Sequence, residues 1–244
     1  MLAATMVGLP AAAGPLQIVA AGLEEPTDRY PHRVLGATPE HAALRVTLSD
    51  GHEGLIRHAP GMVFEDVAAR VLDVTGDGAP EVLVTESHAD LGARVAVYGL
   101  VGGAVGAPTV ALRGATPFIG TRFRWFAIVG AADLTGDGQI EIAAVDRPHL
   151  ARTLRIWRVE SAPDRLSLHQ IASVPAVTNH RIGEDFISGG IRHCPGGALP
   201  EIVLADTGWQ WIKAIHLQGG TPATRTITGP ADASTFARVL RCAD

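Results

Sequence analysis

The chain has 244 residues, 47% of them hydrophobic, and is therefore long enough to bury a sizeable core. Its formal net charge of -5 and its scattered arginines argue against nucleic-acid binding, which requires a basic face. Short runs of Val, Ile, Leu and Ala alternate with turn residues, and this pattern predicts an all-β fold.

Residues 1–14, "MLAATMVGLPAAAG", form an apolar stretch that is too short to span a bilayer. Ala11 and Ala13 form an Ala-x-Ala pattern that suits signal-peptide cleavage, although the usual basic region is missing. The alternatives are a clipped signal peptide and a simple apolar tail. We expect the former, and hence export to the periplasm or the medium. No later stretch has the length and apolar character of a transmembrane segment.

Internal repeats organise the rest of the chain. Glu81, Glu141 and Glu201 fall sixty residues apart, and each opens a short apolar strand that ends in an acid. A second set of strands repeats every fifty-nine residues and is marked by Tyr98, Trp157 and His216. We expect four short strands in each repeat, with an inserted segment at residues 23–40. The repeats cover about 15–60, 61–115, 116–175 and 176–230.

Four strands per repeat are typical of a β-propeller blade, which must stack on its neighbours to bury its faces. Residues 236–242 resemble the first strand of a repeat, whereas residues 16–21 resemble a second strand that lacks its first. Pairing these two segments would close a ring and remove two open sheet edges. The prediction for residues 15–244 is one propeller domain of four blades, each with four antiparallel strands. An open β-solenoid and a β-sandwich are the alternatives.

Two loops carry the pattern Asp-x-Thr-Gly-Asp-Gly-x-x-Glu. Oxygen atoms at positions 1, 3, 5, 7 and 9 of such a loop can surround Ca²⁺. The loops lack the Glu at position 12 that an EF-hand requires. The alternative is a turn in which the Asp side chains bind backbone N–H groups without an ion. The expected ligands are Asp73, Thr75, Asp77, Ala79 and Glu81 in one loop, and Asp133, Thr135, Asp137, Gln139 and Glu141 in the other.

This loop between two apolar strands resembles the FG-GAP/VCBS repeat, a propeller-blade unit of integrin α-subunit heads and many exported bacterial proteins. The resemblance covers about residues 61–229 and implies structural Ca²⁺ binding in these turns. It also implies adhesion or ligand binding more often than catalysis. Thr75 and Thr135 depart from the usual Asp or Asn, which leaves three carboxylates in each loop. The last repeat has Arg192, Cys194 and Gly196 at ligand positions, and we expect it to be metal-free.

The two cysteines, Cys194 and Cys242, both lie just past the end of a predicted innermost strand, in repeats expected to be neighbours. Export would permit a disulfide between them. Two free thiols buried between blades are the alternative.

No sequence motif for a catalytic nucleophile, a zinc protease or a phosphate-binding loop is present. The dispersed histidines are expected to be surface or turn residues. Acidic pairs precede two innermost strands, and in a ring they would face each other across the channel mouth, where they could bind a ligand or act as acid and base. A rim of solvated charges is the alternative. The residues of this possible site are Glu65, Asp66, Arg124, Glu184 and Asp185.

The sequence therefore predicts an exported, Ca²⁺-stabilised monomer that presents a binding face to an unknown protein or glycan. The alternative function is that of a hydrolase or lyase acting on saccharides or phosphate esters through the rim carboxylates. Of the two, the binding protein is favoured, because no catalytic motif was found.

Overall fold

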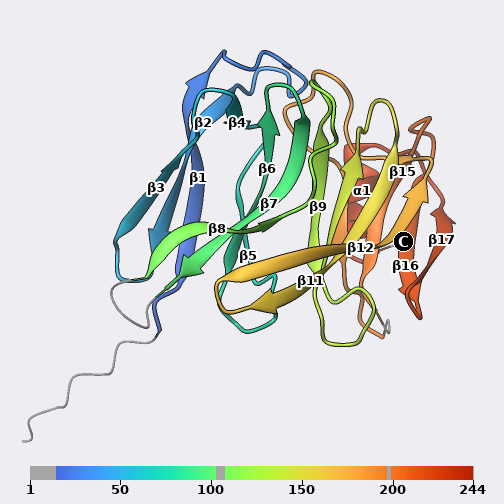
Figure 1. Cartoon of the computed structure of the whole chain (residues 1–244). Helices are drawn as coiled ribbons and strands as arrows, with labels where there is room; N and C mark the ends of the chain where they lie inside the picture. Colours follow the sequence, from blue (N-terminus) through green and yellow to red (C-terminus); the bar gives the residue numbers. More distant parts are fainter. Residues whose placement is uncertain (1–14, 103–107, 197–198, 244) are drawn as a thin grey trace, which may run out of the picture.

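The structure is a computed structural model that describes residues 15–102, 108–196 and 199–243. It is all-β, with three sheets and one short helix in these residues (Figure 1). The expected signal peptide at residues 1–14 lies outside the described residues. No helix in the described ranges is long and apolar enough to cross a membrane.

The first sheet has eight strands in the order β1-β2-β4-β6-β7-β8, with β3 beside β2 and β5 beside β6. A single bridge between His41 of β2 and Phe64 of β4 joins the first two expected repeats. The strands are β1 (Ile18–Thr27), β2 (Glu40–Leu48), β3 (Glu53–Arg57), β4 (Met62–Phe64), β5 (Arg70–Leu72), β6 (Glu81–His88), β7 (Gly92–Val101) and β8 (Thr109–Ala115).

The second sheet is a four-stranded antiparallel meander, β12-β11-β10-β9. The third has the order β13-β15-β16-β17, with β14 also paired to β15. Their strands are β9 (Phe126–Ala132), β10 (Glu141–Asp146), β11 (Thr153–Ala162), β12 (Arg165–Pro175), β13 (Val177–Thr178), β14 (Gly190–Arg192), β15 (Glu201–Asp206), β16 (Ile212–Gln218) and β17 (Thr221–Ile227).

The strands that begin at the three glutamates lie in the interior of their sheets. β6, β10 and β15 each pair on both sides, and β10 is buried along its whole length. A strand covered on both faces needs a continuous apolar run, which is what "EIAAVD" supplies. The largest core cluster combines side chains from all three sheets, such as Leu83, Ile142 and Ile202. The three sheets therefore pack together through this cluster.

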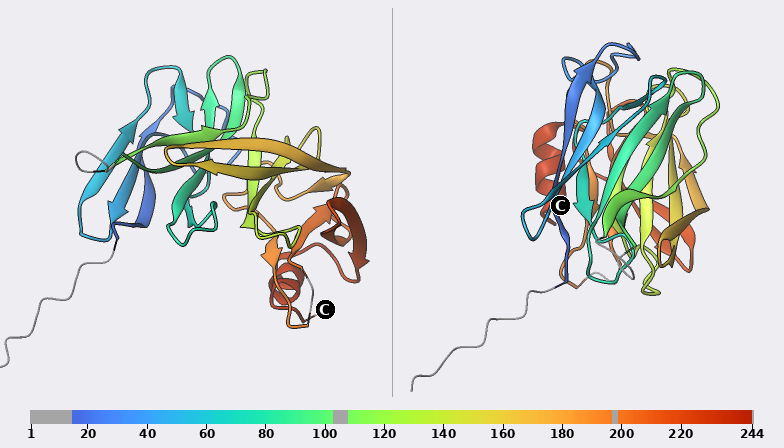
Figure 2. Two further views of the ribbon diagram at one scale, coloured as in Figure 1. Left: turned by 60° about the horizontal axis from the view of Figure 1, so that its bottom comes forward. Right: turned by 60° about the vertical axis from the view of Figure 1, so that its left-hand side comes forward.

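The expectation of a closed four-bladed propeller is wrong. The three sheets follow one another along an open arc, with β1 at one end and β17 at the other (Figure 2). Residues 236–242, expected to be the closing strand, belong mostly to helix α1 (Ala233–Leu240) and make no pair with residues 16–21. In the described part of the chain β1 pairs with β2 alone.

The closing segment is helical because its sequence satisfies a helix better than a strand. The Asp232 side chain caps the helix by accepting a hydrogen bond from the Thr235 N–H at 2.8 Å. Phe236, Val239 and Leu240 recur at helical spacing and pack against the third sheet, in a cluster with Val203 and others. The helix thus covers the third sheet instead of completing a fourth.

Candidate functional site

In each of the two loops expected to bind calcium, the side chain of the first aspartate accepts hydrogen bonds from backbone N–H groups of the same loop. Asp73 accepts hydrogen bonds from the N–H groups of Gly76 (2.7 Å) and Gly78 (2.8 Å). Asp133 does the same with Gly136 (2.6 Å) and Gly138 (2.9 Å). These are the contacts of an Asx-type turn, the alternative left open by the sequence.

The remaining acids of both loops also have partners within the protein. Asp77 and Asp137 accept from the backbone N–H two residues on. One oxygen of Glu81 accepts from Arg113 at 2.5 Å, and one oxygen of Glu141 accepts from Arg158 at 2.8 Å. Among the described residues, no group of three or more His, Cys, Asp or Glu is arranged to hold a metal ion. The side chains present therefore do not fit the calcium site that the resemblance implies.

Cys194 and Cys242 are joined by a disulfide, with Cα atoms 5.5 Å apart. The bridge links the segment after β14 to the residues that follow α1. It therefore fastens the C-terminal helix to the third sheet.

Glu65 and Glu184 of the acidic pairs contact His32 and His180, beside the pocket described below, but neither lines it. Because the sheets form no ring, the pairs do not face each other across a channel mouth. Glu65 and Asp66 are fully buried, and Asp66 accepts hydrogen bonds from backbone N–H groups and from Arg70. Glu184 binds Arg181, whereas Asp185 is exposed. Only Arg124 lines the pocket described next.

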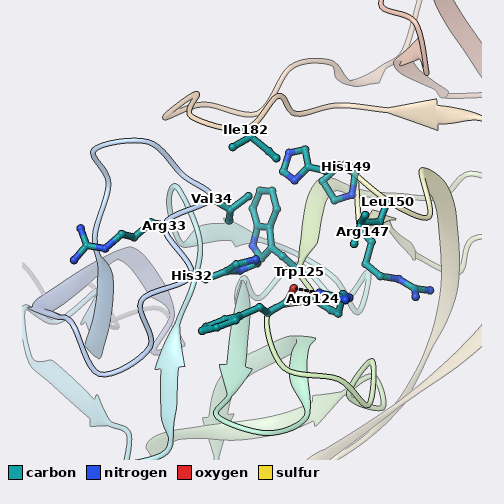
Figure 3. A pocket seen from close by; sticks show the side chains of 11 residues that line it. His32, Arg33, Val34, Arg124, Trp125, Arg147, His149, Leu150 and Ile182 are labelled. Atoms are coloured by element: carbon teal, nitrogen blue, oxygen red, sulfur yellow. Dashed lines mark hydrogen bonds between the residues drawn. The ribbon is translucent and has the colours of Figure 1, made fainter.

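A pocket of about 340 Å³ lies where segments from all three sheets meet (Figure 3). One wall is the β1–β2 connection, residues 28–39, which forms most of the inserted segment 23–40 noted in the sequence. A second wall comes from the segments before β9 and after β10, and Ile182 adds a third. The lining residues are His32, Arg33, Val34, Phe123, Arg124, Trp125, Arg147, Pro148, His149, Leu150 and Ile182.

A glycine allows the walls to approach each other closely. The Gly183 N–H donates to the Val34 carbonyl at 3.2 Å. Gly36 has a φ of +60°, and a Cβ atom there would lie only 2.4 Å from the Gly183 carbonyl oxygen. The contact between residues 28–39 and the segment near Ile182 thus depends on the missing side chain at Gly36.

At one side of the pocket, a buried carboxylate holds His32. Its Nδ1 atom contacts Glu65, whose other oxygen accepts from the Ser87 hydroxyl. Burial raises the pKa of Glu65, and the hydrogen bonds from His32 and Ser87 offset part of that rise. Trp125 Nε1 donates to the Glu65 carbonyl at 2.7 Å. This side of the pocket is therefore a fixed network.

At the other side, two histidines contact each other. His149 Nε2 and His180 Nδ1 are 2.9 Å apart, and His180 Nε2 lies 3.0 Å from the Glu184 carbonyl oxygen. Burial, followed by the neighbouring His180, lowers the pKa of His149 to about 4. Burial also lowers the pKa of His180. Both imidazoles are therefore neutral at physiological pH.

The three arginines of the pocket differ in their partners. Arg147 pairs with Asp146 at 2.6 Å, and Arg33 pairs with Asp28 at 3.0 Å. Figure 3 shows both directed away from the centre of the pocket. Arg124 donates to the Phe123 carbonyl at 2.8 Å and has no carboxylate partner in the described part of the chain. Arg124 is therefore the arginine of the pocket that lacks a carboxylate partner among the described residues.

Sequence reasoning missed most of this site. It included Arg124 but treated His149 and His180 as surface or turn residues, whereas His180 is 1% exposed. The inserted segment at residues 23–40 was the one signal available, since an insertion of that length often carries function.

In the described residues, the fold and the site together define an all-β protein of three sheets with a basic pocket at their junction. No protein-family model and no curated protein matches this chain.

Proposed function

We propose that this protein is an exported binding protein whose pocket holds a small ligand with one carboxylate on an apolar body. The observation that carries the proposal is Arg124, a guanidinium without a carboxylate partner in the described residues, which lines a pocket of about 340 Å³ together with His32. A guanidinium fork matches the geometry of a carboxylate.

The remaining lining supports a ligand with an apolar body. Six of the eleven lining residues are apolar: Val34, Phe123, Trp125, Pro148, Leu150 and Ile182. Small-molecule pockets combine such a lining with a few polar groups that fix orientation. A neutral His149 can exchange a hydrogen bond with the ligand without adding charge. Arg124, which has no carboxylate partner in the described residues, therefore favours a ligand that carries a carboxylate.

The disulfide supports export. Bridges of this kind form in the periplasm or outside the cell and are rare in the cytosol. The bridge between Cys194 and Cys242 is therefore consistent with the signal-peptide pattern predicted from the sequence.

The test is a calorimetric screen of the full chain against aromatic monocarboxylates, aliphatic monocarboxylates, uronic acids and phosphate monoesters. Arg124→Gln should weaken binding of the best carboxylate roughly 10-fold to 100-fold, the loss of a charge-assisted hydrogen bond. Arg165→Gln is the matched control, because Arg165 is exposed and does not line the pocket. Equal affinity of Arg124→Gln and the parent protein would refute the proposal.

The second candidate is an enzyme, a hydrolase or lyase, in which His32 accepts a proton from the substrate or from water. The observation that favours it is the contact between His32 Nδ1 and the buried Glu65, because such a carboxylate orients the imidazole. Turnover of a chromogenic glycoside or phosphate ester, lost in His32→Gln while binding persists, would favour this function. Binding without turnover would favour the first.

A further inference from the structure

We propose that the guanidinium of Arg158 takes the place of a metal ion in the turn formed by residues 133–141, so that this turn is stable without calcium. The Nη2 atom of Arg158 lies 2.7 Å from Asp137 Oδ2, 2.8 Å from Glu141 Oε1 and 3.0 Å from the Thr135 hydroxyl. These three side chains are among those that would otherwise provide ligands to a cation.

The equivalent glutamate in the first sheet is neutralised by an arginine from a different strand. Tyr98 pairs with Val82, as Trp157 pairs with Ile142, so Gly99 stands where the second sheet has Arg158. Gly99 supplies no side chain. Instead Arg113 of β8 crosses it and donates to Glu81 at 2.5 Å. A Cβ atom at Gly99 would lie 2.6 Å from Arg113 Cδ, so the guanidinium arm fills the space.

The third sheet repeats the result with two arginines. Arg192 of β14 donates to Glu201 at 2.7 Å, and Arg225 of β17 donates to the same oxygen at 2.8 Å. The arginines that bind the three glutamates therefore come from different strands of the four-stranded repeats. They lie on the first strand (β14), the third (β11) or the fourth (β8 and β17). A shared requirement for positive charge at this position explains why different strands supply it.

The charge of the Arg158 guanidinium balances that of the Glu141 carboxylate, and this explains why the turn does not need a metal ion. Glu141 is fully buried, and an unpaired buried carboxylate is costly. Arg158 supplies a positive charge and hydrogen bonds to it, so a metal ion at the same oxygens would have to displace a guanidinium that is already bound. The turns are therefore held by internal ion pairs.

The test compares thermal melting of the full chain in excess Ca²⁺ and in excess chelator. We expect the melting temperature of the unmodified protein to be the same in both. Arg158→Met keeps an apolar stem but removes the charge, and it should melt lower in chelator and gain several degrees in millimolar Ca²⁺ by mass action. Arg155→Met, on the same strand, is the control. It leaves Asp146 paired with Arg147 and should not respond to Ca²⁺.

Two results would overturn the proposal. One is a lower melting temperature of the unmodified protein in chelator that is restored by adding Ca²⁺. This measurement does not depend on a variant that folds. The other is an Arg158→Met protein whose melting temperature is lower but does not change with Ca²⁺. That result would mean that the Arg158 guanidinium does not occupy a site where a cation can bind. If Arg158→Met does not fold without metal, refolding it in Ca²⁺ and in chelator gives the same comparison.

Discussion

The indole nitrogen of Trp125 donates a hydrogen bond to the main-chain carbonyl of Glu65 at 2.7 Å, and so joins the segment before β9 to the segment after β4. Trp125 is 2% exposed. Trp125→Phe leaves the Glu65 carbonyl without this donor and should lower the free energy of unfolding by about 1–3 kcal/mol. Urea denaturation measures the change. Trp211→Phe, at a side chain that is 45% exposed, should change little, and equal losses would contradict the prediction.

The close approach of Gly36 and Gly183 predicts that an alanine at position 36 damages the pocket. The added Cβ atom would meet the Gly183 carbonyl oxygen at 2.4 Å, and the φ of +60° is itself strained for alanine. Gly51→Ala is the control, because Gly51 also has a positive φ but has nothing within 4 Å of the added atom. Both should lose about 1–2 kcal/mol from the φ alone. Only Gly36→Ala should lose more, together with ligand affinity; the same loss in both variants would argue against a contact between the walls.

The lowered pKa of His149 predicts a specific loss of stability in acid. The unfolded chain binds a proton at this residue near pH 6.5, whereas the folded protein binds it near pH 4. Between these values the unfolded state holds more protons, so the free energy of unfolding should fall as the pH decreases from 6.5 to 4. His149→Phe should flatten this dependence in urea denaturation, and His169→Phe, at an exposed histidine, should not. Parallel pH profiles for His149→Phe and the parent protein would rule out this assignment.

The Cys194–Cys242 bridge predicts that reduction loosens the C-terminal helix. The linked residues are 48 apart in the sequence, and a loop of that size corresponds to roughly 4 kcal/mol in the chain-entropy account. Reduction should therefore lower the melting temperature and increase hydrogen exchange in α1 (Ala233–Leu240) before the strands of the second sheet. A Cys194→Ser, Cys242→Ser double variant should not respond to reductant, and a response from it would show that the effect arises elsewhere.

The interior strands could be predicted from the sequence because burial leaves a direct trace in it. An uninterrupted apolar run after Glu81, Glu141 or Glu201 fits a strand covered on both faces. The absence of a closed ring could not be predicted in the same way. Residues 236–242 resemble "VAARVLD" at residues 67–73, the first strand of a repeat, but their apolar residues also recur at helical spacing. The aspartate cap at Asp232 was the signal that distinguishes the two.

The pocket was harder to predict than the strands because its parts are distant in the sequence. His32 lies in the β1–β2 connection of the first sheet and His149 in the β10–β11 connection of the second, and the two come together only in the folded protein. The arginines of the two turns were missed for the same reason. Arg113 on β8 reaches Glu81 on β6 across the intervening strand β7, and no spacing of residues along the sequence predicts such a contact.

The crossing of Gly99 by the Arg113 side chain makes these two positions epistatic. A larger residue at position 99 would collide with the side chain of Arg113. Loss of Arg113 alone would leave the Glu81 carboxylate without this arginine partner. Each single change is therefore harmful, whereas Gly99→Arg combined with Arg113→Gly would recreate the arrangement that Glu141 and Arg158 already have. A lineage could pass from one solution to the other only through a less stable intermediate, so whichever arginine came first would tend to persist.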